Sequence, residues 1–73
     1  MSKLYSSREI IKVLTRQDFD FVSQKGSHAK YVRRSTEEAI VVIVPVRKKE
    51  IPRGTFRSIL RQSHLRIEDF EKS

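Results

Sequence analysis

The run AIVVIVPV, at residues 39–46, constrains the fold more than any other part of the sequence. Most of its side chains are β-branched, and these favour a strand because they pack well on a pleated sheet. The run does not alternate between apolar and polar residues, which indicates burial on both faces of the strand or ends covered by helices. Pro45 cannot donate a ladder hydrogen bond, so we expect it at a sheet edge or at the end of the strand.

The remaining segments predict helices and strands around that central run. Ser6 and Glu9 can form a capping box that begins the first helix, because each side chain can accept a hydrogen bond from the backbone amide of the other. Gly26 and Ser27 are a turn signal between two strand-like runs, and Pro52 suits the first turn of a helix. We expect helices over 6–17, 51–63 and 67–72, and strands over 19–25, 28–34 and 39–46. This order predicts an α+β fold, a three-stranded antiparallel meander with helices on one face.

Single residues add further expectations about the helices. Asp18 and His64 each follow the last turn of a helix, where a left-handed residue lets the chain leave and a histidine can interact with the last carbonyls. Gly54 costs about 1 kcal/mol relative to alanine inside a helix, so we expect it to allow the close approach of another backbone. Ile67 and Phe70 should point inward from the last helix.

The charge and length of the chain limit its function classes. The net charge is +7 over 73 residues, and a small basic domain attracts polyanions, of which nucleic acid is the commonest, although charge also aids solubility. The length predicts a single domain over 1–73 with a modest core. The chain has no cysteine, no signal-peptide pattern and no apolar run long enough to span a membrane, which favours a cytoplasmic protein.

His28 is the side chain best suited to chemistry. Side chains alternate along a strand, so His28 and Lys30 should face one way while Ala29 and Tyr31 face the core. A neutral imidazole can accept the proton of an RNA 2′-hydroxyl, and neighbouring cations can stabilise the charge that develops on the phosphate. The alternative interpretation is that His28 only contacts phosphate or solvent.

Metal and cofactor sites have no support in the sequence. The only two histidines, His28 and His64, lie far apart and follow no metal-ligand spacing. The segments GSHAK and PRGT lack the spacing of a phosphate-binding loop. We therefore expect no metal and no small-molecule cofactor.

Several motifs together resemble the HicA family of toxin mRNA interferases. The motifs, in chain order, are SSREIIKVL, GSH, VPV and PRGTFRSILRQSHLRIEDF. The resemblance covers about residues 6–70 and implies a fold similar to double-stranded-RNA-binding domains. It also implies a metal-independent endoribonuclease that cuts mRNA and arrests growth, with a HicB antitoxin that covers the active site. By motif, His28 is the catalytic histidine and Gly26 the turn glycine.

Two departures from the family pattern bear on catalysis. Ala29 stands where a second histidine is common, and Arg47 stands where a histidine often follows VPV. His28 therefore has no histidine partner at either position. The acid that protonates the leaving group would then be His28 in turn, Lys30, Tyr31, a basic residue such as Arg47, or water.

The basic residues around His28 are the candidates for RNA binding. The expected RNA-binding residues are Lys25, Gly26, Ser27, Lys30, Arg33, Arg47, Lys48, Lys49, Arg53 and Arg57. The stripe of Arg53, Arg57 and Arg61 on the second helix could equally be a solvated face or an antitoxin contact. Two rival functions remain: a non-catalytic RNA-binding module of the same fold, and a degenerate toxin retained only as the partner of its antitoxin.

Overall fold

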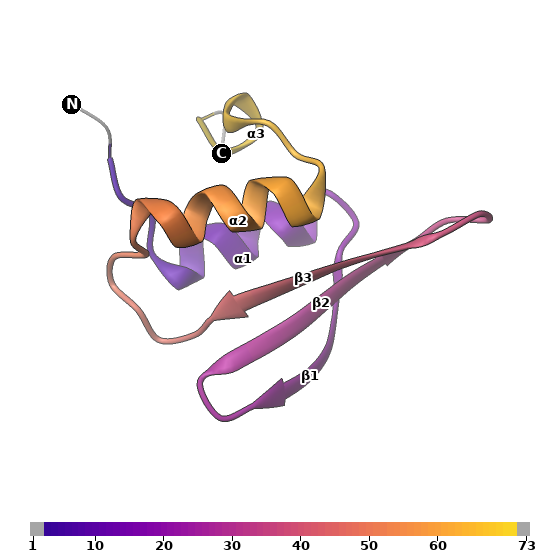
Figure 1. The fold of residues 1–73 in the computed structure, drawn as a ribbon, viewed down its shortest axis with the longest axis horizontal. Coiled ribbons are helices and arrows are strands. Elements are labelled where there is room, and N and C mark those ends of the chain that lie inside the picture. Colours follow the sequence, from indigo (N-terminus) through magenta and orange to yellow (C-terminus); the bar gives the residue numbers. More distant parts are fainter. Residues whose placement is uncertain (1–2, 72–73) are drawn as a thin grey trace.

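A computed structural model describes residues 3–71 and contains three helices and three strands. In chain order these are α1 (Ser7–Arg16), β1 (Asp20–Lys25), β2 (His28–Arg34), β3 (Ala39–Pro45), α2 (Arg53–Ser63) and α3 (Ile67–Glu71). The strands form one antiparallel sheet in the order β1-β2-β3. Figure 1 shows α1 and α2 on one face of this sheet and α3 beyond them. The predicted α+β order is therefore confirmed.

The element boundaries differ little from the predicted ones. No boundary moves by more than two residues, and the largest change is at α2, which begins at Arg53 with Pro52 as its N-cap. Residue 72, the predicted end of the last helix, lies outside the described residues. Within residues 3–71 no helix combines the length and the apolar character that a membrane crossing requires.

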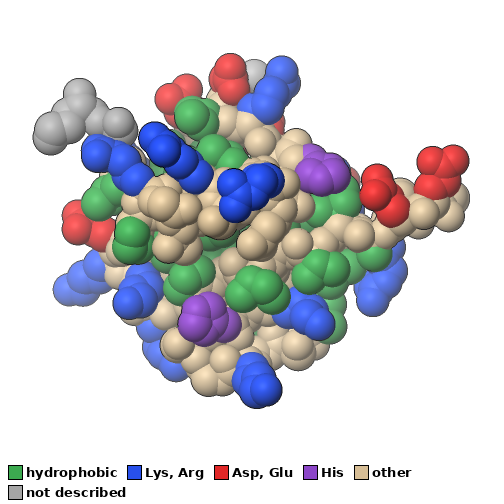
Figure 2. Space-filling view, in the orientation of Figure 1, with side chains coloured by type: hydrophobic (Ala, Val, Ile, Leu, Met, Phe, Trp, Pro, Cys, Tyr) green, Lys and Arg blue, Asp and Glu red, His purple; other side chains and the backbone are tan. Residues whose placement is uncertain are grey.

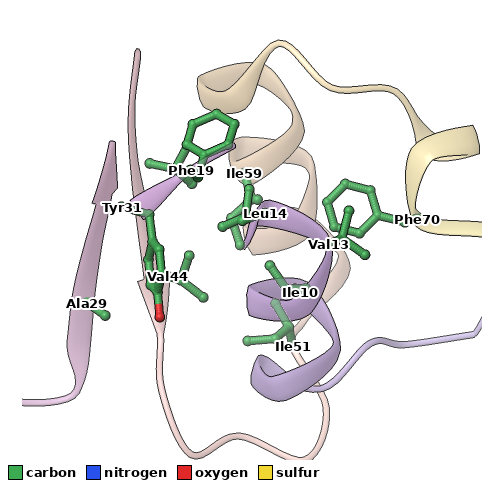
Figure 3. Close-up of a cluster of buried hydrophobic side chains, with 11 residues drawn as sticks. Ile10, Val13, Leu14, Phe19, Ala29, Tyr31, Val44, Ile51, Ile59 and Phe70 are labelled. Carbon is green, nitrogen blue, oxygen red and sulfur yellow. The ribbon is translucent and has the colours of Figure 1, made fainter. Parts of the chain in front are cut away.

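The core lies between the helices and the face of the sheet that they cover (Figure 3). The helices α1 and α2 and the sheet all contribute side chains that are fully buried. These are Ile10, Val13 and Leu14 of α1, Ile59 of α2, Ala29 of β2, and Val42 and Val44 of β3. Phe70 of α3 closes the far side of the core. The centre of its ring lies 5.0 Å from that of Phe56 and 5.8 Å from that of Tyr5. The apolar contact of both helices with one sheet face orients β2 and β3, whereas β1 has no buried residue.

The strand β3 is buried on one face only, so burial on both faces, one of the two predicted alternatives, is wrong. Val42 and Val44 are fully buried, whereas Val41 and Ile43 are 42% and 38% exposed. The reason is that both long helices lie on the same side of the sheet, which leaves the other face open. Pro45 is the last residue of β3, as predicted, and β3 is an edge strand.

The expectations for single residues in and after the helices are confirmed in part. Asp18 and His64 have φ values of 69° and 62°, so both adopt the predicted left-handed geometry after a helix. Phe70 is buried as expected, but Ile67, the first residue of α3, is 50% exposed and lines a groove beside α2. A Cβ at Gly54 would meet nothing within 4 Å, so the expected close approach of another backbone is also wrong.

The predicted capping box begins α1. The Ser6 hydroxyl accepts a hydrogen bond from the Glu9 amide at 3.1 Å, and Glu9 Oε1 accepts one from the Ser6 amide at 2.9 Å. Glu9 Oε2 also lies 2.7 Å from Lys3 Nζ. The hydrogen bond from Lys3, followed by that from the Ser6 amide, lowers the pKa of Glu9 below its ordinary value.

This lowered pKa predicts a loss of stability in acid. A carboxylate with a depressed pKa in the folded state stabilises the fold above its unfolded pKa of 4.5, and this contribution is lost as the pH falls below that value. Glu9→Gln should therefore reduce the free energy of unfolding at about pH 6 and make it fall less between about pH 4.5 and pH 3. Urea unfolding at several pH values measures both effects.

A control for this prediction is Glu37→Gln at the tip of the β2–β3 hairpin. Glu37 is exposed, and its side chain makes no hydrogen bond or ion pair with any of residues 3–71. The pH dependence of stability in this variant should match that of the wild type. An unchanged acid dependence in Glu9→Gln would contradict the role given to the capping carboxylate.

Candidate functional site

The turn between β1 and β2 presents His28 at the start of the central strand. Gly26 has the positive φ of 60° that the tight turn requires, and its carbonyl accepts a hydrogen bond from Gln24 Nε2 at 3.1 Å. In the sheet register, His28 pairs with Lys25 of β1 on one side and with Pro45 of β3 on the other. The imidazole therefore stands between a lysine and the end of the edge strand.

The alternation predicted for β2 is confirmed. His28 and Lys30 are exposed on the open face of the sheet, while Ala29 and Tyr31 are 1% and 7% exposed on the face covered by the helices. The Ser27 hydroxyl lies 3.4 Å from His28 Nδ1. No other hydrogen bond, ion pair or ring contact of this imidazole occurs among residues 3–71, and the side chain is exposed, so Nε2 is accessible to a substrate.

The position of Tyr31 argues against one of the side chains predicted as a possible leaving-group acid. Tyr31 lies on the opposite face of the sheet from His28, and burial raises the pKa of its phenol. Lys30 lies two residues along the same strand and faces the same side as His28. The sheet therefore separates the phenol of Tyr31 from the imidazole, whereas Lys30 lies on the same face as the imidazole.

A bend after β3 brings further basic residues to His28. The Val46 amide donates a hydrogen bond to the Ser27 carbonyl at 2.8 Å, which ties the bend to the β1–β2 turn. Arg47 has a positive φ of 60°, and the exposed Lys48 and Lys49 follow it. We call this assembly the basic junction: residues 25–28, Lys30, and residues 45–49.

The segment RKKE at residues 47–50 belongs to this bend and not to the start of α2. The start of α1 holds it in place. The Ser7 hydroxyl donates to the Pro45 carbonyl at 2.6 Å and accepts from the Lys48 amide at 3.0 Å, and the Ser7 amide donates to the Lys48 carbonyl at 2.9 Å. Farther along, the Ile51 amide donates to the Tyr5 carbonyl at 2.7 Å. The cations after β3 therefore stand on a fixed backbone.

The charges of the basic junction are not neutralised within the described part of the chain. Lys25, Lys30, Arg47, Lys48 and Lys49 are all exposed, and their side chains make no ion pair or hydrogen bond to residues 3–71. Figure 2 shows Lys and Arg side chains spread over much of the visible face, while acidic side chains lie mainly at the tip of the β2–β3 hairpin and around α3. The junction can therefore offer its full positive charge to a polyanion.

Three predicted RNA-binding residues do not join the basic junction. Arg33 lies on the helix-facing side of β2, where its Nη1 donates to the Gln17 carbonyl at 3.2 Å and its guanidinium carbon lies 5.1 Å from the centre of the Phe19 ring. Arg53 and Arg57 line a groove of about 540 Å³ between α2, α3 and the segment before α1, and no residue of the junction lines it. The structure brings together the other predicted site residues, 25–28, Lys30 and 47–49.

Sequence reasoning missed Ser7 as part of the site. The signal that could have revealed it is the pair of consecutive serines at the start of α1, since one serine is enough to cap a helix. As for metals, no group of three His, Cys, Asp or Glu side chains suited to holding an ion occurs among the described residues.

The contacts of Arg33 predict a structural effect on mutation. Arg33→Ala removes a charged hydrogen-bond donor and a cation–π contact, and should lower the free energy of unfolding by about 1–2 kcal/mol. Lys30→Ala, on the same strand but on the open face, should change it by less than about 0.5 kcal/mol. Urea denaturation of both variants compares them directly. Equal stabilities, with RNA affinity reduced only in Arg33→Ala, would instead place Arg33 in a binding surface.

One comparison with known proteins bears on this site. A family model described as the HicA toxin of bacterial toxin–antitoxin systems matches residues 7–65. The matched span runs from the first residue of α1 to just beyond α2 and includes the whole basic junction. No individual curated protein matches the sequence significantly.

Proposed function

Because the chain belongs to the HicA toxin family of bacterial toxin–antitoxin systems, we propose that it is a metal-independent endoribonuclease that cleaves mRNA, with His28 as its catalytic residue. The observation that carries this proposal is the position of His28. Its imidazole is exposed on the open face of the sheet, beside Lys25 and Lys30 and next to the bend that carries Arg47. An accessible base among unpaired cations suits a phosphodiester substrate.

The proposed reaction uses the 2′-hydroxyl of RNA. His28 takes the proton from this hydroxyl, the 2′-oxygen forms a bond to the adjacent phosphorus, and the bond from phosphorus to the 5′-oxygen breaks. The 5′-oxygen receives a proton from the His28 imidazolium or from Lys30, Arg47 or water. Lys25, Lys30 and the cations of residues 47–49 stabilise the negative charge that develops on the phosphate oxygens. DNA lacks the 2′-hydroxyl and would not be cut.

The main test is substitution of His28. Loss of a general acid–base group slows a reaction by about 10²- to 10⁴-fold, so His28→Ala should reduce RNA cleavage by that factor. Because the side chain is exposed, the free energy of unfolding should change by less than about 0.5 kcal/mol. Cleavage of a labelled RNA in the presence of EDTA measures the rate, and circular dichroism confirms the fold.

His64→Ala is the matched control, because His64 is the other histidine and lies at the end of α2, outside the basic junction. It should cleave RNA at the wild-type rate. Cleavage by His28→Ala at the wild-type rate would overturn the catalytic assignment. If the wild type binds RNA in a salt-sensitive way but does not cleave it, the chain is the non-catalytic RNA-binding module.

Membership of a toxin–antitoxin family implies an antitoxin partner. We propose that this partner is a HicB-type antitoxin that covers His28. The open face of the sheet supports this location, since the exposed Val41 and Ile43 share a face with His28 and lie on an edge strand. An acidic partner with apolar contacts would bury this surface and pair with the cations of the junction.

This location predicts which substitutions weaken inhibition. Val41→Lys should weaken binding of a HicB-type antitoxin by about tenfold or more, because it places an ammonium in an apolar contact. Ile67→Lys is the control, since Ile67 is similarly exposed but lies on α3, beyond the helices. Titration calorimetry and inhibition of RNA cleavage measure both effects. Equal affinity for the two variants would exclude the open face as the antitoxin site.

A further inference from the structure

Ser7 has a buried side chain that both donates and accepts a hydrogen bond. It is 3% exposed, although it is the first residue of a helix at the edge of the fold. Its hydroxyl donates to the Pro45 carbonyl and accepts from the Lys48 amide, so it uses its donor and one of its acceptor positions. Both bonds cross more than 35 positions of the chain. A buried hydroxyl that bonds two distant backbone groups in this way holds them in one arrangement.

The helix itself does not need this hydroxyl. The neighbouring Ser6 caps α1, because its side chain accepts from the Glu9 amide while Glu9 bonds the Ser6 amide in return. The two consecutive serines therefore have separate roles. Ser6 serves its own helix, and Ser7 serves a distant segment.

That segment is the bend that carries the cations of the basic junction. The two bonds of the Ser7 hydroxyl reach Pro45 and Lys48, on either side of Arg47 with its positive φ. Within the same bend, the Val46 amide bonds the Ser27 carbonyl, one residue before His28. A short chain of hydrogen bonds thus runs from Ser7 through the bend to the turn that presents the imidazole.

We propose that Ser7 is a positioning residue for RNA cleavage: its hydroxyl fixes the bend at residues 45–48 and so sets the position of Arg47 and Lys48 relative to His28. This inference rests on the proposed function of His28. Ser7 is too buried to touch the substrate, so it acts only through the backbone that it holds. Misplacement of reacting groups by about 1 Å slows catalysis by about 100-fold, which makes such a support important.

The test compares Ser7→Ala with Ser6→Ala, its matched control. Ser6→Ala removes the helix cap and destabilises the fold by about 1 kcal/mol without touching the bend. Where both variants are folded, Ser7→Ala should lower the single-turnover cleavage rate by about 10- to 100-fold, while Ser6→Ala should leave it unchanged. The dissociation constant for RNA and its salt dependence should change by less than about threefold in Ser7→Ala, because the number of cations is the same.

Two further measurements keep the inference testable. The Lys48 amide should exchange its hydrogen at least about tenfold faster in Ser7→Ala than in Ser6→Ala, because it has lost its acceptor. Ser7→Thr retains the hydroxyl and should restore cleavage at least in part. If Ser7→Ala does not fold, Ser7→Cys replaces it, since a thiol of similar size is a weak hydrogen-bonding group and should reproduce the slow cleavage.

The outcomes separate this inference from the proposed function. Equal cleavage rates in Ser7→Ala and Ser6→Ala, or unchanged exchange at Lys48, would overturn the role of Ser7 while leaving His28 as the catalytic residue. If the wild type shows no cleavage that depends on His28, the proposed function fails and the positioning role fails with it. A slow Ser7→Ala that binds RNA normally, with cleavage restored by Ser7→Thr, would establish the positioning role.

Discussion

The apolar contact between the two long helices and one face of the sheet decides which side chains of the central strand β2 face solvent. In β2 this contact buries Ala29 and Tyr31, and alternation then turns His28 and Lys30 to the open face. A shift of the register by one residue would bury the imidazole and expose the tyrosine, at a large loss of apolar burial. The core therefore protects the orientation of the candidate site, although no core side chain belongs to it.

The basic junction is assembled from segments that are distant in sequence. Bringing them together requires an unfavourable backbone conformation and places like charges near one another. Arg47 adopts a left-handed conformation that disfavours a non-glycine residue by about 1 kcal/mol. The exposed cations nearby also repel one another, in a chain with a net charge of +7. The hydrogen bonds of Ser7 and Val46 offset the strain and the repulsion, because they give partners to backbone groups on both sides of Arg47. A glycine at this position would relieve the strain but would remove one cation of the basic junction.

Much of this arrangement could be predicted from local patterns. The capping box at Ser6, the Gly26 turn and the alternation around His28 each depend on neighbours in the sequence, and all three are present in the structure. The two faces of β3 could not be separated, because exposed and buried positions there are equally apolar. Arg33 was assigned by its charge, yet its even spacing from Ala29 and Tyr31 already placed it on the helix-facing side. The two consecutive serines could have suggested that Ser7 does more than cap the helix, but its partners Pro45 and Lys48 lie far along the chain, where no local pattern indicates them.

If His28 is the catalytic residue, as proposed, its exposure bears on how a single histidine could perform both proton transfers. A lone imidazole that takes the 2′-proton becomes the acid that the leaving oxygen needs, so one residue can perform both steps if the substrate stays in place between them. Solvent access also lets the ring exchange its proton with water after each turnover. In this scheme a second histidine is not needed, but side chains that hold the phosphate in place are. Under the proposed function, Lys25 and Lys30 on the sheet and Arg47 on the bend tied to the β1–β2 turn are the candidates for this role, since they belong to different elements that meet at that turn.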